Sequence, residues 1–357
     1  MNRILMLLLL AAPAALIARA TGGSPVLVFI LSAVGLIPLA DLIGEATEEL
    51  AAYTGPRLGG LLNATLGNAA ELIITIFAIN AGLLDLVKAS ITGSILGNLL
   101  LVLGLALLAG GLRNGTQFFD RRQAGLNATL LILAVVALAI PSLFDVAIAE
   151  LPDSELLFSE GVALILIIVY VLTLVYGFTA KAVDNVVTRE AAPEHAARWS
   201  LQFSIIVLIA ATVGTAIVSE TLVGAVEPVT VALGLSEFFL GIIIIPLVGN
   251  VAEHLAAVTV AIKNKMELSL AIALGSSIQV ALLVAPLLVF ISLLMGQRLL
   301  LVFTSFELIA LFGASVIAAF IAQDGESNWL EGAMLLAVYL IIGLAFFFLP
   351  GTAVSVH

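Results

Sequence analysis

Two glutamates stand in stretches that are otherwise apolar enough for the inside of a lipid bilayer. Glu71 lies in LGNAAELIITIF, and Glu253 lies in VGNVAEHLAAV. A carboxylate at the centre of a bilayer costs at least ~2.5 kcal/mol, so such residues normally face a protein interior or an aqueous cavity. An asparagine, Asn68 or Asn250, precedes each glutamate by three positions, which predicts an amide oxygen on the same helical face.

The two stretches are copies of one another. Gly67 corresponds to Gly249, and the offset of 249 − 67 = 182 residues is kept without a gap over two predicted spans. Chance explains such a match poorly. Two intramembrane acids at equivalent positions favour a shared use over the alternative, a pair that only holds helices together. The matched pairs are Gly67 and Gly249, Asn68 and Asn250, Ala70 and Ala252, Glu71 and Glu253, Ala89 and Ala271, Gly93 and Gly275, and Ser94 and Ser276.

The spans that follow add more oxygen atoms. TGSILGN places Ser94 and Asn98 at i and i+4, and GSSIQVA places Ser276 and Gln279 at i and i+3. Small and hydroxyl residues often only pack transmembrane helices together, so each pattern alone is a weak sign. Next to the two glutamates, these four side chains extend a set of oxygen ligands.

Backbone carbonyls could complete that set. Gly67 and Gly249 stand where a broken helix would free them, which is tolerated at that depth only inside protein or beside water. Such oxygens form a hard ligand set that suits Ca²⁺, which takes roughly six to eight of them. We expect Ca²⁺ as a transported substrate, with Glu71, Glu253, Asn68 and Asn250 as metal ligands and with no cofactor. Other residues that could break these helices are Pro246, Gly59 and Gly60.

The composition fixes the class of protein. Of 357 residues, 62% are hydrophobic and 10% are charged, against roughly a quarter charged in soluble domains. The 13 basic residues are too few and too scattered for a nucleic-acid surface, so nucleic acid is not an expected partner. The absence of cysteine excludes thiolate metal sites and thiol catalysis. The chain is therefore an all-α polytopic membrane protein with the lipid bilayer as its partner.

Apolar runs of about 20 residues predict eleven membrane spans. The first, MNRILMLLLLAAPAALIARA, would also suit a secretory signal peptide. Equivalent spans 3 and 8 are five crossings apart, so the two copies run through the membrane in opposite directions, as in many secondary transporters. The predicted spans are 4–20, 26–45, 58–83, 89–112, 125–144, 161–180, 201–219, 237–262, 268–294, 302–322 and 329–349.

The repeat and the charges predict the organisation and the orientation. We expect an N-terminal transmembrane helix (1–22), a first five-span repeat (23–180), a cytoplasmic connector (181–200) and a second repeat (201–357). The positive-inside rule places the side with most Lys and Arg in the cytoplasm, so the N-terminus is cytoplasmic and the C-terminus outside, in a bacterial or archaeal plasma membrane. The basic residues of the other side are Arg19, Lys88 and Arg298.

The same residues carry a family resemblance. GNAAELIITIFAI with GSILGNLLLVLG, and GNVAEHLAAVTVAIKNKMELSLAIALGSSIQVAL, resemble the two signature repeats of the Ca²⁺/H⁺ antiporters, the CAX branch of the Ca²⁺/cation antiporter superfamily. The resemblance implies eleven spans with inverted five-helix repeats, and Glu71 and Glu253 as carriers of Ca²⁺ and H⁺. It places around them Asn68, Asn250, Ser94, Ser276 and Gln279.

The resemblance also implies a cytoplasmic acidic entrance on the second span, formed by Glu45, Glu48 and Glu49, although a solvated helix end explains these residues equally well. Many relatives have a dense acidic run between the halves. The connector KAVDNVVTREAAPEHAARWS has only scattered acids, which puts regulation through it in doubt. A homo-oligomer stays open.

The mechanism follows from the competition of protons and Ca²⁺ for two carboxylates in a medium of low dielectric constant. If rocking is allowed only when their charges are neutralised, exchange by alternating access results. His254, next to Glu253, is either a proton relay or a filler of a polar gap. Two alternatives remain: a Na⁺-coupled exchanger of the same superfamily, and an intramembrane hydrolase built on Glu253 and His254, which would explain neither the repeat nor Glu71.

Overall fold

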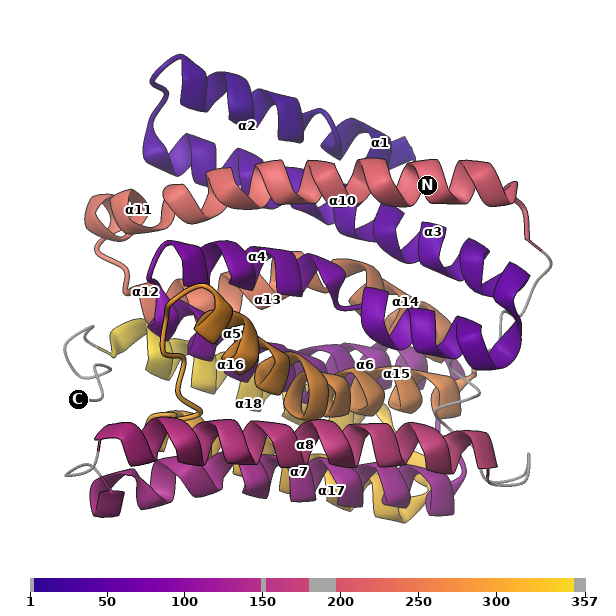
Figure 1. Ribbon diagram of the computed structural model, residues 1–357. Helices are drawn as coiled ribbons and strands as arrows, with labels where there is room; N and C mark the ends of the chain where they lie inside the picture. Colours follow the sequence, from indigo (N-terminus) through magenta and orange to yellow (C-terminus); the bar gives the residue numbers. More distant parts are fainter. Residues whose placement is uncertain (1–2, 149–151, 180–196, 350–357) are drawn as a thin grey trace. The chain divides into compact units, whose positions relative to one another are not determined.

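The computed structural model describes residues 3–148, 152–179 and 197–349, and these residues are almost entirely helical (Figure 1). The helices of the first half are α1 (Arg3–Leu8), α2 (Ala11–Ala20), α3 (Pro25–Leu66), α4 (Ala69–Asn80), α5 (Leu84–Leu96), the π-helix η1 (Gly97–Val102), α6 (Leu103–Asn114), α7 (Arg121–Ile148) and α8 (Pro152–Thr179). The helices of the second half are α10 (Leu201–Gly224), α11 (Val226–Leu233), α12 (Glu237–Phe239), η2 (Leu240–Ile244), α13 (Ile245–Gly249), α14 (Val251–Ile262), α15 (Met266–Gln279), η3 (Val280–Val284), α16 (Ala285–Leu294), α17 (Ser305–Asp324) and α18 (Trp329–Phe348).

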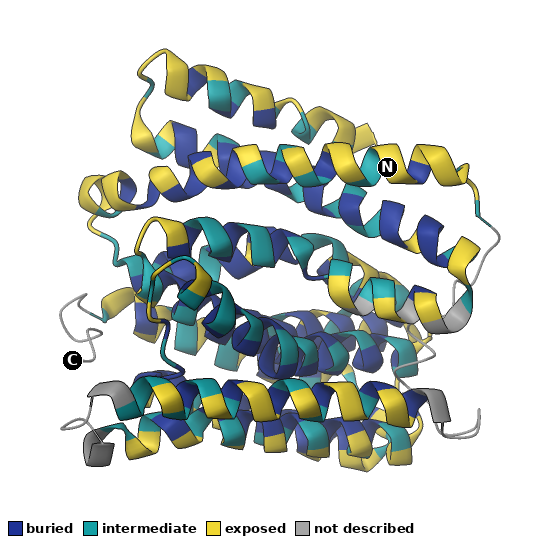
Figure 2. Ribbon diagram, viewed as in Figure 1, coloured by how far each residue is buried: buried dark blue, intermediate teal, exposed yellow. Residues whose placement is uncertain are grey.

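The helices have the length and the surface of membrane spans. Among the described residues, nine helices are long and apolar enough to cross a bilayer, and the pair Glu237–Gly249 and Val251–Ile262, bent by 62°, makes a tenth. The short apolar helix α4 follows α3 after a break, and it lies within the residues of the third predicted span. Exposed positions recur along the outer helices (Figure 2). On α8 they include the large apolar residues Leu164, Ile165 and Ile168, as expected for a surface that meets lipid. The predicted polytopic all-α fold is confirmed.

The sequence repeat is also a repeat of structure. Adding 182 to the bounds of α4, 69 and 80, gives 251 and 262, the bounds of α14. The π-helices η1 and η3 likewise fall at equivalent positions, directly after α5 and α15. A π-helical turn widens a helix locally and is frequent at functional sites. The repeat therefore preserves both the helix breaks and the wide turns.

The chain forms two compact units, each drawn from both repeats. The first comprises Met1–Val87 and Val187–Ala252. In it α3 packs along α10 and α2, and Gly35 allows the close approach of α2, since a Cβ there would lie 2.6 Å from the backbone nitrogen of Ala12. Most of the predicted connector (181–200) lies outside the described residues, and the predicted repeat domains remain a prediction.

The second unit comprises Lys88–Val186 and Glu253–His357. Here α7 packs against both α8 and α17 (Figure 1), and α6 packs against α18 at Gly332, where a Cβ would lie 2.3 Å from the nitrogen of Leu108. Two short strands, β1 (Gln117–Phe118) and β2 (Glu326–Ser327), pair antiparallel.

Some predicted boundaries are wrong. The second span does not end near residue 45, because α3 continues to Leu66 with a kink at Gly55, whose φ of 79° is easy only for glycine. Gly59 and Gly60 do not break the helix, and the break falls after Leu66. The tenth span begins at Ser305 rather than 302, because residues 297–304 are not helical.

Candidate cation site

The first glutamate stands directly after a helix break. The break separates α3 from α4 at Gly67 and Asn68, and Glu71 lies in the first turn of α4. The unsatisfied N–H groups of a first turn favour a negative charge, so this position suits a carboxylate. Asn68 takes the N-cap position, but its side chain makes no capping hydrogen bond. Both side chains are buried, Glu71 with 2% and Asn68 with 1% of its surface exposed.

A residue at the second helix break contacts the first glutamate. Asn250, at the break between α13 and α14, donates a hydrogen bond from Nδ2 to Oε1 of Glu71. The preceding Gly249 is packed against the same side chain, because a Cβ on it would lie only 3.0 Å from Cγ of Glu71. Oδ1 of Asn250 is buried and accepts no hydrogen bond within the described part of the chain. The first unit thus holds a carboxylate beside an amide oxygen that has capacity for a further partner.

The second unit holds the other predicted oxygens. Ser94 on α5 and Asn98 in η1 are buried, and Nδ2 of Asn98 donates to Oγ of Ser276 at 3.0 Å. This hydrogen bond joins the two repeats through residues that the sequence predicted from each separately. Gln279, the last residue of α15, is half-buried beside the start of η3.

Glu253 repeats the local structure of Glu71. It lies in the first turn of α14, directly after the second break, and is half-buried. His254 is buried, and its Nε2 has no hydrogen-bond partner among the described residues. No three His, Cys, Asp or Glu residues gather into a metal-binding group in the described part of the chain. A cation here would therefore need amide, hydroxyl or carbonyl oxygens in addition to carboxylates.

The family of the chain follows from its similarity to known proteins. The family model described as "Sodium/calcium exchanger protein" matches residues 24–179 and 203–348. The chain belongs to this family, in its Ca²⁺/H⁺ antiporter branch.

The relatives match over almost their whole length. A Ca²⁺/H⁺ antiporter of Aphanothece halophytica is 45% identical over 98% of this chain and 97% of its own length. The Ca²⁺/H⁺ antiporter ChaA of Bacillus subtilis is 44% identical over 98% of this chain and 100% of its own. The solved structure of native YfkE superposes with a TM-score of 0.85 at 41% identity, over 97% of this chain and 100% of that one. This is a family of exchangers rather than of enzymes.

The predicted acidic entrance of this exchanger-family chain takes an unexpected form. Glu49 is buried, and its carboxylate accepts hydrogen bonds from the backbone nitrogens of Arg198 and Trp199 and from Nε of Arg198. Glu45 lies 3.7 Å from the same guanidinium, whereas Glu48 is exposed. Glu49 is therefore not a solvated acid. Its hydrogen bonds hold the residues before α10 against α3.

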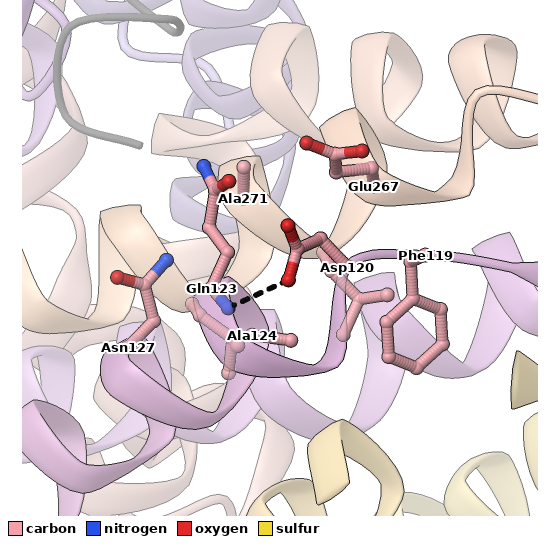
Figure 3. A pocket seen from close by; sticks show the side chains of 9 residues that line it. Phe119, Asp120, Gln123, Ala124, Asn127, Glu267 and Ala271 are labelled. Atoms are coloured by element: carbon pink, nitrogen blue, oxygen red, sulfur yellow. Dashed lines mark hydrogen bonds between the residues drawn. The ribbon is translucent and has the colours of Figure 1, made fainter. Parts of the chain in front are cut away.

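A small hollow lies elsewhere in the second unit (Figure 3). It is lined by residues of α7 and α15 and contains no residue of the predicted site. Asp120 at its rim caps α7, accepting hydrogen bonds from the backbone nitrogens of Arg122 and Gln123. The hollow is thus a feature of the α7–α15 contact.

One buried acid was missed in the sequence. Glu307 is 1% exposed, and no counterpart is found at the equivalent offset, 307 − 182 = 125, where the chain has Gly125. The available signal was the pattern Thr304-x-x-Glu307, which is typical of a capping box, and the structure contains that box at the start of α17.

Proposed function

We propose that this chain exchanges Ca²⁺ for protons across a membrane by alternating access, and that Glu71 and Glu253 are both needed to hold either ion. The observation that carries the proposal is the Glu71–Asn250 contact at two equivalent helix breaks, with Oδ1 of Asn250 left to accept a further partner. Two relatives at 45% and 44% identity over nearly the whole chain are Ca²⁺/H⁺ antiporters, which supports the same substrate pair.

Charge explains why two carboxylates are required. One Ca²⁺ held by two carboxylates is neutral, whereas a single carboxylate leaves a net positive site inside the membrane, which is costly. Two protons neutralise the same pair. The transporter then passes between its inward-open and outward-open states only when the pair of carboxylates is neutralised by Ca²⁺ or by protons. This requirement couples the movement of the two ions.

The remaining oxygens complete the coordination. Asn68 and Asn250 supply amide oxygens, and a helix break at Gly67 and Gly249 would free backbone carbonyls for coordination. We include four hydroxyl and amide side chains among the groups that bind or orient the ion, namely Ser94, Asn98, Ser276 and Gln279. No cofactor has a part in this exchange.

Uptake of radioactive Ca²⁺ into vesicles that contain the purified protein tests the proposal. We expect uptake when an outward-directed proton gradient is imposed, loss of uptake when the gradient is collapsed, and no response to a Na⁺ gradient. Ca²⁺ affinity should fall as the pH falls, because protons occupy the same oxygens. Uptake driven by Na⁺ alone would instead favour a Na⁺-coupled exchanger, and an affinity independent of pH would exclude shared carboxylates.

The orientation is part of the proposal. The distribution of Lys and Arg supports a cytoplasmic N-terminus in a plasma membrane. In this cysteine-free chain, single cysteines at the exposed Thr116 and Asn80 should react with an impermeant maleimide from the cytoplasmic and the outer side, respectively. Reaction of both from one side would contradict the assigned topology.

A further inference from the structure

Glu307 is a buried acid that the exchange mechanism does not use. It belongs to the second unit, at the start of α17, and both of its carboxylate oxygens are hydrogen-bonded. Oε2 accepts from the backbone nitrogen of Thr304 at 2.8 Å and from its hydroxyl at 3.0 Å, which is the ordinary capping box. Oε1 accepts at 2.8 Å from Oγ1 of Thr92, a residue of α5 that is 215 positions away in the chain.

The contact with Thr92 exceeds what a helix cap requires. A capping box satisfies the N-terminus of its own helix, and its glutamate commonly stands at a solvated surface. Here the second oxygen of the carboxylate is directed to a different helix, and both partners are buried. The arrangement joins α5 to α17 through a buried hydrogen bond between side chains.

Thr92 stands directly before the part of α5 that carries site residues. Ser94 follows two positions later, and Asn98 lies within η1, which begins at Gly97. A π-helical turn shifts every residue beyond it relative to a regular helix, so the place of Asn98 depends on how the preceding turn is held. Asn98 in turn donates to Ser276 of the other repeat.

The second repeat has a different residue at the equivalent position. The offset of 182 equates Thr92 with Leu274, since 92 + 182 = 274, and leucine has no hydroxyl to donate. Leu274 lines the small hollow between α15 and α7, where α7 holds the place in the first repeat that α17 holds in the second. The hydrogen bond from a threonine hydroxyl to a carboxylate therefore belongs to α5 and is not repeated at the equivalent residue of α15.

From these observations we infer that the Thr92–Glu307 pair is a positioning device for the cation site: it fixes α5 so that Ser94 and Asn98 keep the geometry that Ca²⁺ requires. This inference rests on the proposed exchange and adds two residues to it. Neither Thr92 nor Glu307 contacts the ion, and the pair acts through the helix that they hold.

The test compares two changes at one position. Thr92→Val keeps the shape and removes the hydroxyl, whereas Thr92→Ser keeps the hydroxyl. We expect Thr92→Val to raise the apparent KM for Ca²⁺ about tenfold, as for loss of a buried hydrogen bond, with a smaller change in maximal rate. Thr92→Ser should stay within about twofold of the original protein. Thr47→Val is the control, because Thr47 is an equally buried threonine whose hydroxyl donates to the carbonyl of Ile43 on its own helix.

A double-mutant cycle separates positioning from mere stability. Thr92→Val combined with Ser94→Ala should be clearly non-additive in KM, whereas Thr47→Val combined with Ser94→Ala should be additive. Equal KM values for Thr92→Val and Thr92→Ser, or a lower melting temperature of Thr92→Val with an unchanged KM, would overturn the inference. The proposed exchange fails separately, if the original protein shows no proton-driven uptake at all. Glu307→Gln, which keeps an acceptor for Thr92 but not all acceptors for Thr304, should give an intermediate KM.

Discussion

The two glutamate-bearing helices, α4 and α14, begin alike and are supported differently. Both start at equivalent residues after a break, and both place the glutamate in the first turn. Glu71 is buried and bonded by Asn250, whereas Glu253 is half-buried and is followed by a histidine where the first copy has Leu72. The repeat preserves the residues that we propose bind the ion but not their surroundings.

The difference extends to the far ends of the helices. The chain leaves α4 at Gly82 and α14 at Asn264, equivalent residues that both have positive φ, 77° and 61°. The last carbonyls of α14 are bonded by side chains of α6 and β1, since Asn114 and Gln117 both donate to the carbonyl oxygen of Ala261. The proposed ion ligands are thus repeated in both copies, whereas the contacts that hold the two helices differ.

The largest expected effect tests the symmetric part. Glu71→Gln and Glu253→Gln each keep the shape of the side chain and remove its charge, so each should abolish proton-driven Ca²⁺ uptake in vesicles. Because either change already disables the pair, the double variant should be no worse than the single ones, a strongly non-additive result. Near-native uptake by a folded Glu71→Gln protein would reduce Glu71 to a buried structural acid.

A smaller loss should follow from Gly249→Ala. The added Cβ would meet Cγ of Glu71 at 3.0 Å, so the carboxylate must move by a few tenths of an ångström. We expect the Ca²⁺ affinity measured by calorimetry to fall about tenfold, because misplaced ligands lose coordination geometry. Gly44→Ala is the matched control, since a Cβ at Gly44 meets nothing within 4 Å. Equal affinities of the two variants would mean that the close contact with Glu71 has no functional role.

The sequence predicted the symmetric features well, because the repeat itself carries them. The offset of 182 matched Gly67 with Gly249 at the two breaks, the two glutamates, and Ser94 with Ser276. Asn98 was found separately in TGSILGN, and the structure joins it to Ser276. Hydropathy found the spans, since a bilayer requires long apolar segments. The π-helices were not predicted, because a wide turn such as η1 has the same composition as a regular helix and depends on packing.

The asymmetric features were harder to predict, because they depend on contacts between distant residues. Residues 302–304 were predicted as the start of the tenth span, yet residues 297–304 are not helical. Their backbone nitrogens are satisfied by serine hydroxyls of three helices, with Leu299 bonded to Ser292, Leu301 to Ser159, and Phe303 to Ser142. Serines on separate helices give no joint signal in a single sequence. The hydrogen bonds of Glu49 with Arg198 escaped prediction for the same reason.

The support of α14 gives a prediction about stability. Nε2 of Gln117 donates to the carbonyl of Ala261 at 2.9 Å and to Oδ1 of Asn264 at 3.0 Å, and the residue is buried. Gln117→Ala should therefore lower the free energy of unfolding by about 1–3 kcal/mol, because it removes two hydrogen bonds made by a buried side chain. Asn114→Ala removes donors to the same carbonyl from an exposed side chain and should cost less. Thermal unfolding in detergent checks the order, and an equal loss in both would contradict the role given to burial.

The smallest effect should come from His254, where the two copies differ next to the glutamate. A relay would require the imidazole to exchange protons with a partner, but its Nε2 has no hydrogen bond within the described residues, and the first copy has Leu72 in its place. We therefore predict that His254 fills a polar gap, and that His254→Leu, which copies the first repeat, changes the maximal uptake rate less than about threefold, because no bonded partner is left unsatisfied. His254→Asn, which keeps a polar group, should give the same profile of uptake against pH as His254→Leu. A large fall in rate in both variants, together with a displaced pH optimum, would instead assign a proton relay to the second copy alone and make the exchange chemistry itself asymmetric.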